Sequence, residues 1–192
     1  SGGEDEEPTE NPNASKPRYI WIDAAANFPD FANSKENIAR DLALAKDAGF
    51  TDIVVDVRPT TGDVLFKTNL VDQVKFMYAW IGSNYTKVER TATWDYLQAF
   101  VDEARKQGLR IHAAINTFVG GNQIDGGTGL LYRDQSKAEW ATQMNMQVGI
   151  TSVMNTSEST KFFNPAHPEV QTFLCDLLKD LAGYDLDGIF LD

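Results

Sequence analysis

The sequence is poor in cysteine, histidine and basic residues, and each shortage excludes a class of function. Its 192 residues include one cysteine and two histidines, so an internal disulfide and a cysteine-rich metal site are excluded. Lys and Arg number 17 against 28 Asp and Glu, and the net charge of -11 argues against nucleic acid or an anionic membrane surface as a partner. No run approaches the ~20 apolar residues that a membrane-spanning helix needs.

Sequence motifs for bound cofactors are missing as well. The glycines at 126, 127 and 129 neither follow an expected strand nor precede the lysine of a phosphate loop. His112 and His167 lack metal-ligand spacing, and no serine nucleophile elbow is present. We therefore expect neither a cofactor nor a metal. Cys175 lies in an apolar helical run, which predicts a small buried side chain.

The first residues differ in composition from the rest of the chain. Residues 1–17 are acidic, rich in Gly and Pro, and nearly free of apolar side chains, so we expect a disordered acidic N-terminal tether. It resembles the segment that follows the lipidated cysteine of a bacterial surface lipoprotein, although a plain disordered leader fits equally well. Residues 18–192 are expected to form the folded domain.

Strand patterns alternate with helix patterns along residues 18–192. Apolar runs bounded by turn residues predict strands, and apolar side chains at helical spacing predict helices. The expected strands are 19–23, 52–58, 109–116 and 186–192, and the expected helices are 34–49, 93–108 and 168–183, with a short one at 137–147.

This alternation predicts an α/β fold with parallel strands. A TIM (β/α)8-type barrel takes about 250 residues, so four strand–helix units are expected to make half a barrel. The alternative is a complete open α/β sheet, but an edge is a poor place for a last strand as apolar as residues 188–191. We therefore expect the N-terminal half of a barrel, truncated at strand four.

Each expected strand carries one apolar row and one row that becomes polar toward its C-terminal end. Successive side chains on a strand point to opposite faces, so Ile53, Val55 and Val57 share the face opposite Asp56 and Arg58. The apolar row should face the helices and the polar row the barrel axis. The side chains expected to converge at the mouth, where barrel enzymes keep their chemistry, are Asp23, Asp56, Arg58, His112, Asn116 and Asp192.

Two connections, residues 60–92 and 117–163, are unusually long and leave the strands at the mouth side. Loops of this length in a compact domain are usually functional or mobile. They carry aromatic residues, among them Trp80 and Trp140, that could stack on sugar rings, although such rings more often anchor a loop to the domain.

Three sequence blocks resemble the glycoside-hydrolase-like family 10 proteins of bacteria. They are Val54-Val55-Asp56-Val57-Arg58-Pro59, the stretch from Trp94 to Asn116, and the stretch from Phe163 through Asn164-Pro165-Ala166-His167-Pro168 to Asp192. Ala114 stands where the family usually has tryptophan. The resemblance implies a secreted or surface-anchored enzyme of the cell envelope that processes polysaccharides. We expect a carbohydrate substrate as its partner, no nucleic acid, and contact with the membrane only through a lipid anchor.

Glycosidases need two carboxyl groups beside the scissile bond. The resemblance makes Asp192 the leading catalytic candidate, as acid/base or as the carboxylate next to it. The expected substrate-binding residues are Asp23, Asp56, Arg58, His112, Asn116, Trp80 and Trp140. The alternative is a glycan-binding surface lipoprotein without catalysis. Residues 1–192 alone are expected to be inactive, and the open sheet edges predict self-association.

Overall fold

The computed structural model describes residues 16–192, so most of the expected tether lies outside the described residues. The described residues form ten strands and eight helices, of which three are 3-10 helices (η) and two are single α turns. The strands and helices in chain order are β1 Tyr19–Ile22, α1 Phe28–Phe31, α2 Lys35–Asp47, β2 Asp52–Arg58, β3 Phe76–Ile81, β4 Asn84–Glu89, α3 Tyr96–Gln107, β5 Arg110–Ile115, β6 Val119–Asn122, η1 Ile124–Gly126, α4 Leu130–Arg133, η2 Gln135–Trp140, β7 Gln143–Met146, β8 Gly149–Ser152, η3 Val153–Asn155, β9 Thr160–Phe162, α5 Pro168–Leu181 and β10 Gly188–Leu191.

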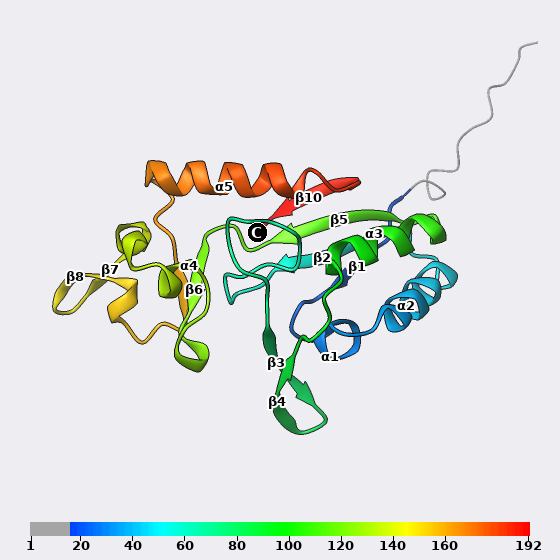
Figure 1. Cartoon of the computed structure of the whole chain (residues 1–192), viewed down its shortest axis with the longest axis horizontal. Helices are drawn as coiled ribbons and strands as arrows, with labels where there is room; N and C mark the ends of the chain where they lie inside the picture. Colours follow the sequence, from blue (N-terminus) through cyan, green and yellow to red (C-terminus); the bar gives the residue numbers. More distant parts are fainter. Residues whose placement is uncertain (1–15) are drawn as a thin grey trace, which may run out of the picture.

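Four of these strands form one parallel sheet, in the order β1-β2-β5-β10. They are the four strands predicted from the sequence, each within a few residues of its expected bounds, and they pair in chain order (Figure 1). Tyr19 pairs with Asp52, and Asp52 pairs in turn with Arg110. The C-terminal ends of the four strands therefore lie along one edge of the sheet.

The apolar rows of the strands pack against the helices, as their alternation predicts. Ile53, Val55 and Val57 are fully buried and share one core with side chains of α2, α3 and α5. The helices also end where the sequence indicates. The Ser34 hydroxyl caps α2 by accepting from the Asn37 N–H at 3.1 Å, and Gly108 ends α3 with a φ of 68°.

The two long connections lie beyond the C-terminal ends of the sheet strands (Figure 1). The first contains the β3–β4 hairpin, and the second contains β6 to β9 with α4 and the 3-10 turns. The predicted helix 137–147 is wrong. After η2 the chain becomes extended, because Thr142 donates its N–H to the Phe162 carbonyl at 2.8 Å and β7 pairs with β8. This pairing outweighs the local helix preference.

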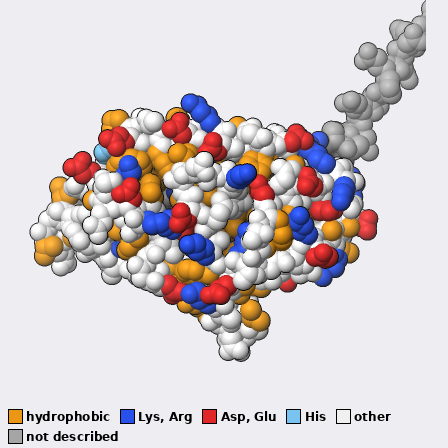
Figure 2. Space-filling model, viewed as in Figure 1, with side chains coloured by type: hydrophobic (Ala, Val, Ile, Leu, Met, Phe, Trp, Pro, Cys, Tyr) orange, Lys and Arg blue, Asp and Glu red, His pale blue; other side chains and the backbone are white. Residues whose placement is uncertain are grey.

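Acidic and basic side chains are interspersed over the visible face of the molecule, with hydrophobic ones between them (Figure 2). Cys175 is exposed on α5, so its predicted burial is wrong. It borders a shallow apolar surface formed with Leu178, Ile189 and Leu191. Among residues 16–192, every helix is too short or too polar to cross a bilayer.

Candidate active site

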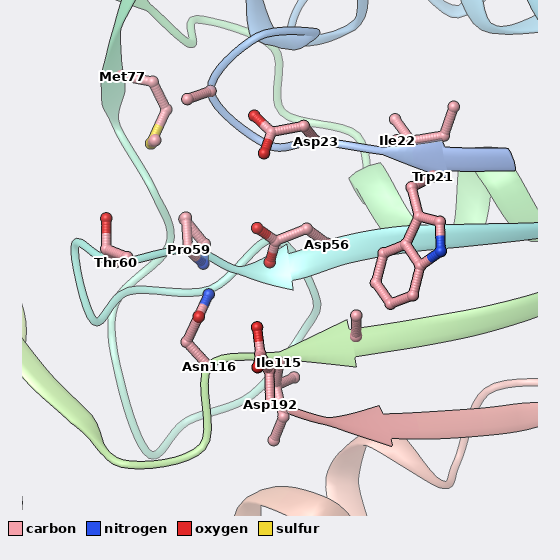
Figure 3. Close-up of a pocket in the computed structure, with 12 residues that line it drawn as sticks. Trp21, Ile22, Asp23, Asp56, Pro59, Thr60, Met77, Ile115, Asn116 and Asp192 are labelled. Carbon is pink, nitrogen blue, oxygen red and sulfur yellow. The ribbon is translucent and has the colours of Figure 1, made fainter.

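Three carboxyl groups converge on a pocket of about 260 Å³ at the C-terminal ends of the sheet strands. Asp23, Asp56 and Asp192 point into it together with Asn116 (Figure 3). All four were predicted from the alternation of the strands. The pocket is completed by Trp21, Ile22, Ala25, Pro59, Thr60, Met77, Ala114 and Ile115.

Each polar side chain is carried by a different strand of the sheet. Asp23 directly follows β1, Asp56 lies near the end of β2, Asn116 follows β5, and Asp192 follows β10. The main chain ties the last two together, since the Thr117 N–H donates to the Asp192 carbonyl at 3.1 Å. The strand ends thus hold the four side chains on one framework.

Asp56 has the most perturbed carboxyl group of the pocket. Burial raises its pKa to about 7, and the charges of Asp23 and Asp192 add to the shift. The Arg58 N–H, which donates to Asp56 Oδ1 at 3.1 Å, opposes the rise only in part. Asp56 is therefore protonated below about pH 7, which suits a group that donates a proton.

Asp23 and Asn116 are oriented by backbone contacts. Asp23 is exposed, and its Oδ1 accepts from the Ala26 N–H at 2.7 Å. Asn116 Nδ2 donates to the Arg58 carbonyl at 2.9 Å. This bond fixes the amide plane, so that Asn116 Oδ1 is free to accept from a ligand hydroxyl.

Arg58 lies outside the pocket, contrary to its predicted place in the polar row. The pairing of β2 with β5 shifts between Asp56 and Arg58, so that Arg58 lies opposite Ile115, a residue of the helix-facing row. Such a bulge moves the side chains after it to another face. The fully buried guanidinium donates to the carbonyls of Asn116, Thr117 and Val119, and it has no accessible surface to offer a ligand.

Trp140 is also placed differently from its prediction. Only 6% of it is exposed, and its ring packs against Phe163 and Phe173 while Nε1 donates to Glu169 at 3.2 Å. It anchors the second connection to α5 and leaves little ring face for a sugar. Trp80 is 69% exposed at the end of β3, beside Tyr85, but does not line the pocket.

His112 lies deeper in the sheet than the pocket. Its Nε2 is 2.6 Å from Asp52 Oδ2, and its ring packs against Tyr19 and Phe190. Burial alone would raise the pKa of Asp52, but hydrogen bonds from Arg110, Thr51 and His112 hold it at about 2. This group stabilises the sheet away from the strand tips.

Sequence reasoning missed several residues that line the pocket. Pro59 and Thr60 directly follow β2, and that position was a usable signal. Met77 reaches the pocket from the β3–β4 hairpin, for which the sequence offered no indication. Within the described residues, no three His, Cys, Asp or Glu side chains are arranged to hold a metal ion.

Comparison with protein families gives a match over nearly the whole chain. The model of the family described as glycosyl hydrolase-like 10 matches residues 16–192. The resemblance expected from the three sequence blocks is thereby confirmed.

A relative among curated proteins is the S-layer-related protein of Niallia circulans. It is 30% identical over 179 residues, which are 90% of this chain and 11% of the relative. The chain thus spans about a tenth of the length of that relative.

Solved structures share the fold at low sequence identity. One is a hypothetical protein from Ruminiclostridium thermocellum, with a TM-score of 0.55, 15% identity, and coverage of 91% of this chain and 74% of that one. Another is alpha-L-fucosidase isoenzyme 2 from Paenibacillus thiaminolyticus, with a TM-score of 0.56, 18% identity, and coverage of 91% and 23%. These likenesses show a fold related to the barrel-type folds of glycoside hydrolases, and they show the fold alone.

Proposed function

Because the chain belongs to the glycosyl hydrolase-like 10 family, we propose that it hydrolyses glycosidic bonds of a polysaccharide or other glycan. The pocket at the ends of β1, β2, β5 and β10 is its active site. The observation that carries this proposal is the convergence of Asp23, Asp56 and Asp192 on one pocket.

Two carboxyl groups with different proton affinities are the basis of glycoside hydrolysis. Asp56, whose pKa is about 7, acts as general acid. It gives its proton to the glycosidic oxygen as the bond from that oxygen to the anomeric carbon breaks. Asp192 acts from the same pocket as the carboxylate that activates water or attacks the anomeric carbon. The family resemblance made Asp192 the candidate for acid/base or for the carboxylate next to it, and the burial of Asp56 favours the second of these roles for Asp192.

The remaining polar and aromatic groups of the pocket would hold the sugar. Trp21 presents an exposed ring on the same side of the sheet as Asp56, and an aromatic face suits the C–H groups of a pyranose. Asp23 and Asn116 accept hydrogen bonds from sugar hydroxyls. A pocket with a few convergent polar groups is the usual form of such a site.

The test uses the protein as its cells produce it and a panel of polysaccharides. Hydrolysis is measured as the release of reducing ends. We expect Asp56→Asn and Asp192→Asn each to lower kcat/KM by about 10²–10⁴-fold. Asp41→Asn, at a half-buried position on α2 where Asp41 pairs with Arg40 outside the pocket, is the matched control. With aryl glycosides, whose leaving groups need little protonation, Asp56→Asn should lose much less than Asp192→Asn. Unchanged hydrolysis in both pocket variants would refute the proposal.

A second candidate function is glycan binding without hydrolysis. The exposed rings of Trp80 and Tyr85 on the β3–β4 hairpin favour it, because both remain open to solvent outside the pocket. Binding of a glycan without cleavage would support this candidate over the first, provided that the Trp80→Ala variant loses affinity for that glycan.

We also propose a location at the cell envelope. The name of the Niallia relative refers to the surface layer of a cell, and a polysaccharide substrate would be met there. Fractionation of the producing cells tests this location, and recovery of the protein from the cytosol would count against it.

A further inference from the structure

A second cavity, of about 660 Å³, lies between residues 67–75 and the segment that leads into α3. Its wall contains three basic side chains, Lys67, Lys75 and Arg90, together with Thr93 and Trp94. It shares no lining residue with the carboxyl pocket. The two cavities therefore differ in charge as well as in position.

Acidic residues outnumber basic ones in this chain by 28 to 17. Among residues 16–192, none of Lys67, Lys75 and Arg90 forms an ion pair with a carboxylate. Their charges are thus left for a ligand or for solvent.

Lys75 and Arg90 are also neighbours across the base of the β3–β4 hairpin. Phe76 pairs with Glu89, and the Arg90 N–H donates to the Lys75 carbonyl at 2.8 Å, which continues the same register. Lys75 and Arg90 therefore reach the cavity wall from adjacent positions on the two strands of the hairpin base.

The wall of the cavity is held in place before any ligand arrives. Arg90 donates from Nη1 to the Ala92 carbonyl at 3.1 Å and from Nη2 to the Trp94 carbonyl at 2.5 Å. Its Cζ lies 4.8 Å from the centre of the Trp94 ring. The one carboxylate in the wall, Asp95, accepts from the Gln98 N–H at Oδ1 and from the Tyr184 hydroxyl at Oδ2.

We propose that this cavity binds the anionic substituent, a carboxylate or a phosphate, of a saccharide. Lys67 and Lys75 contact the anion, Arg90 contributes its fixed charge, and the Trp94 ring packs against the sugar. Charge-assisted hydrogen bonds to lysine supply the affinity, and the ring supplies the preference for a saccharide. The saccharide part rests on the proposed function, whereas the anion site rests on the cavity and its charges.

Isothermal titration calorimetry of the full chain tests the proposal with four probes: trigalacturonate, glucose 6-phosphate, inorganic phosphate and neutral maltotriose. We expect at least one of the two anionic sugars to bind, and which one binds identifies the substituent. Maltotriose should not bind at this cavity. Affinity should fall about tenfold for each lysine removed in Lys67→Gln and Lys75→Gln, and it should weaken as salt is added.

Lys106→Gln, on the exposed face of α3, is the matched control and should bind as the wild type does. Asp56→Asn should also bind normally, which separates this proposal from hydrolysis at the other pocket. Absence of binding by both anionic sugars, or equal binding by the Lys67→Gln/Lys75→Gln double variant, would overturn the anion site. Inorganic phosphate binding as tightly as glucose 6-phosphate would overturn the role of the sugar.

Discussion

Asp56 owes its proton affinity to its position near the end of a central strand. β2 is paired on both sides, by β1 and β5, so the carboxyl group sits among neighbouring chains and loses much of its hydration. Asp23 and Asp192 place further negative charge nearby. Both effects disfavour the ionised form, and the same two effects must also make the stability of the protein depend on pH.

The direction of that dependence follows from the two pKa values of Asp56. The carboxyl group has a pKa of about 7 in the folded protein and 3.8 as the ordinary value. Between these values the folded state binds a proton that the unfolded state has released, so the contribution of Asp56 to stability is highest below about pH 4 and falls as the pH rises to 7. We expect Asp56→Asn to remove roughly 2–4 kcal/mol of this loss. Urea unfolding at pH 5 and pH 8 measures it, with Asp41→Asn as control, and an identical pH dependence in both variants would contradict it.

At the scale of elements, the β6–α4 region depends on close contact between backbones. Gly129 has a φ of 82°, and a Cβ there would lie 2.6 Å from Gly121 Cα and 2.8 Å from the Thr61 carbonyl oxygen. Neighbouring Gly126 has a similar φ of 85° but open space around it. Substitution of these two glycines therefore separates two contributions to the loss of stability: the backbone conformation, which both share, and the steric clash, which only Gly129 has.

We therefore expect Gly129→Ala to destabilise the protein by more than about 3 kcal/mol, because backbone atoms cannot move aside easily. Gly126→Ala should cost only about 1 kcal/mol, the penalty of a left-handed conformation. Thermal unfolding of both variants measures the difference. Equal losses would mean that the loop relaxes around the added methyl group.

The elements that could be predicted from sequence are those with a regular apolar period. The alternation of Ile53, Val55 and Val57 was sufficient to place Asp56 in the pocket, because successive side chains of a regular strand point to opposite faces of the sheet. Arg58 was misplaced because a bulge changes the pairing without changing the apolar pattern. Trp140 was misplaced because the local sequence around an aromatic residue in a loop does not show whether the ring anchors that loop or binds a ligand.

At the scale of the whole molecule, one face of the sheet carries exposed aromatic and apolar side chains. Trp21 is 57% exposed and Phe190 37%, and their ring centres lie 5.5 Å apart. β1 and β10 each have one unpaired edge among the described residues. Exposed apolar surface and open strand edges both favour association.

We expect this 192-residue chain, studied alone, to self-associate. Size-exclusion chromatography with light scattering measures its mass, and Trp21→Ser should shift the population toward the monomer. Leu44→Ser, at an exposed apolar position on α2, is the matched control. A monomer with a sharp unfolding transition would contradict the expectation and would show that the four strand–helix units close a core unaided.

The buried guanidinium of Arg58 has a consequence for how the pocket can open. It joins the end of β2 to the carbonyls of Asn116, Thr117 and Val119, which follow β5, while the Asn116 amide donates to the Arg58 carbonyl. Neither strand end can fray without breaking the bonds of the other. Amide hydrogens of the two segments should therefore exchange with solvent as one cooperative unit, so that this wall of the pocket opens only as a whole.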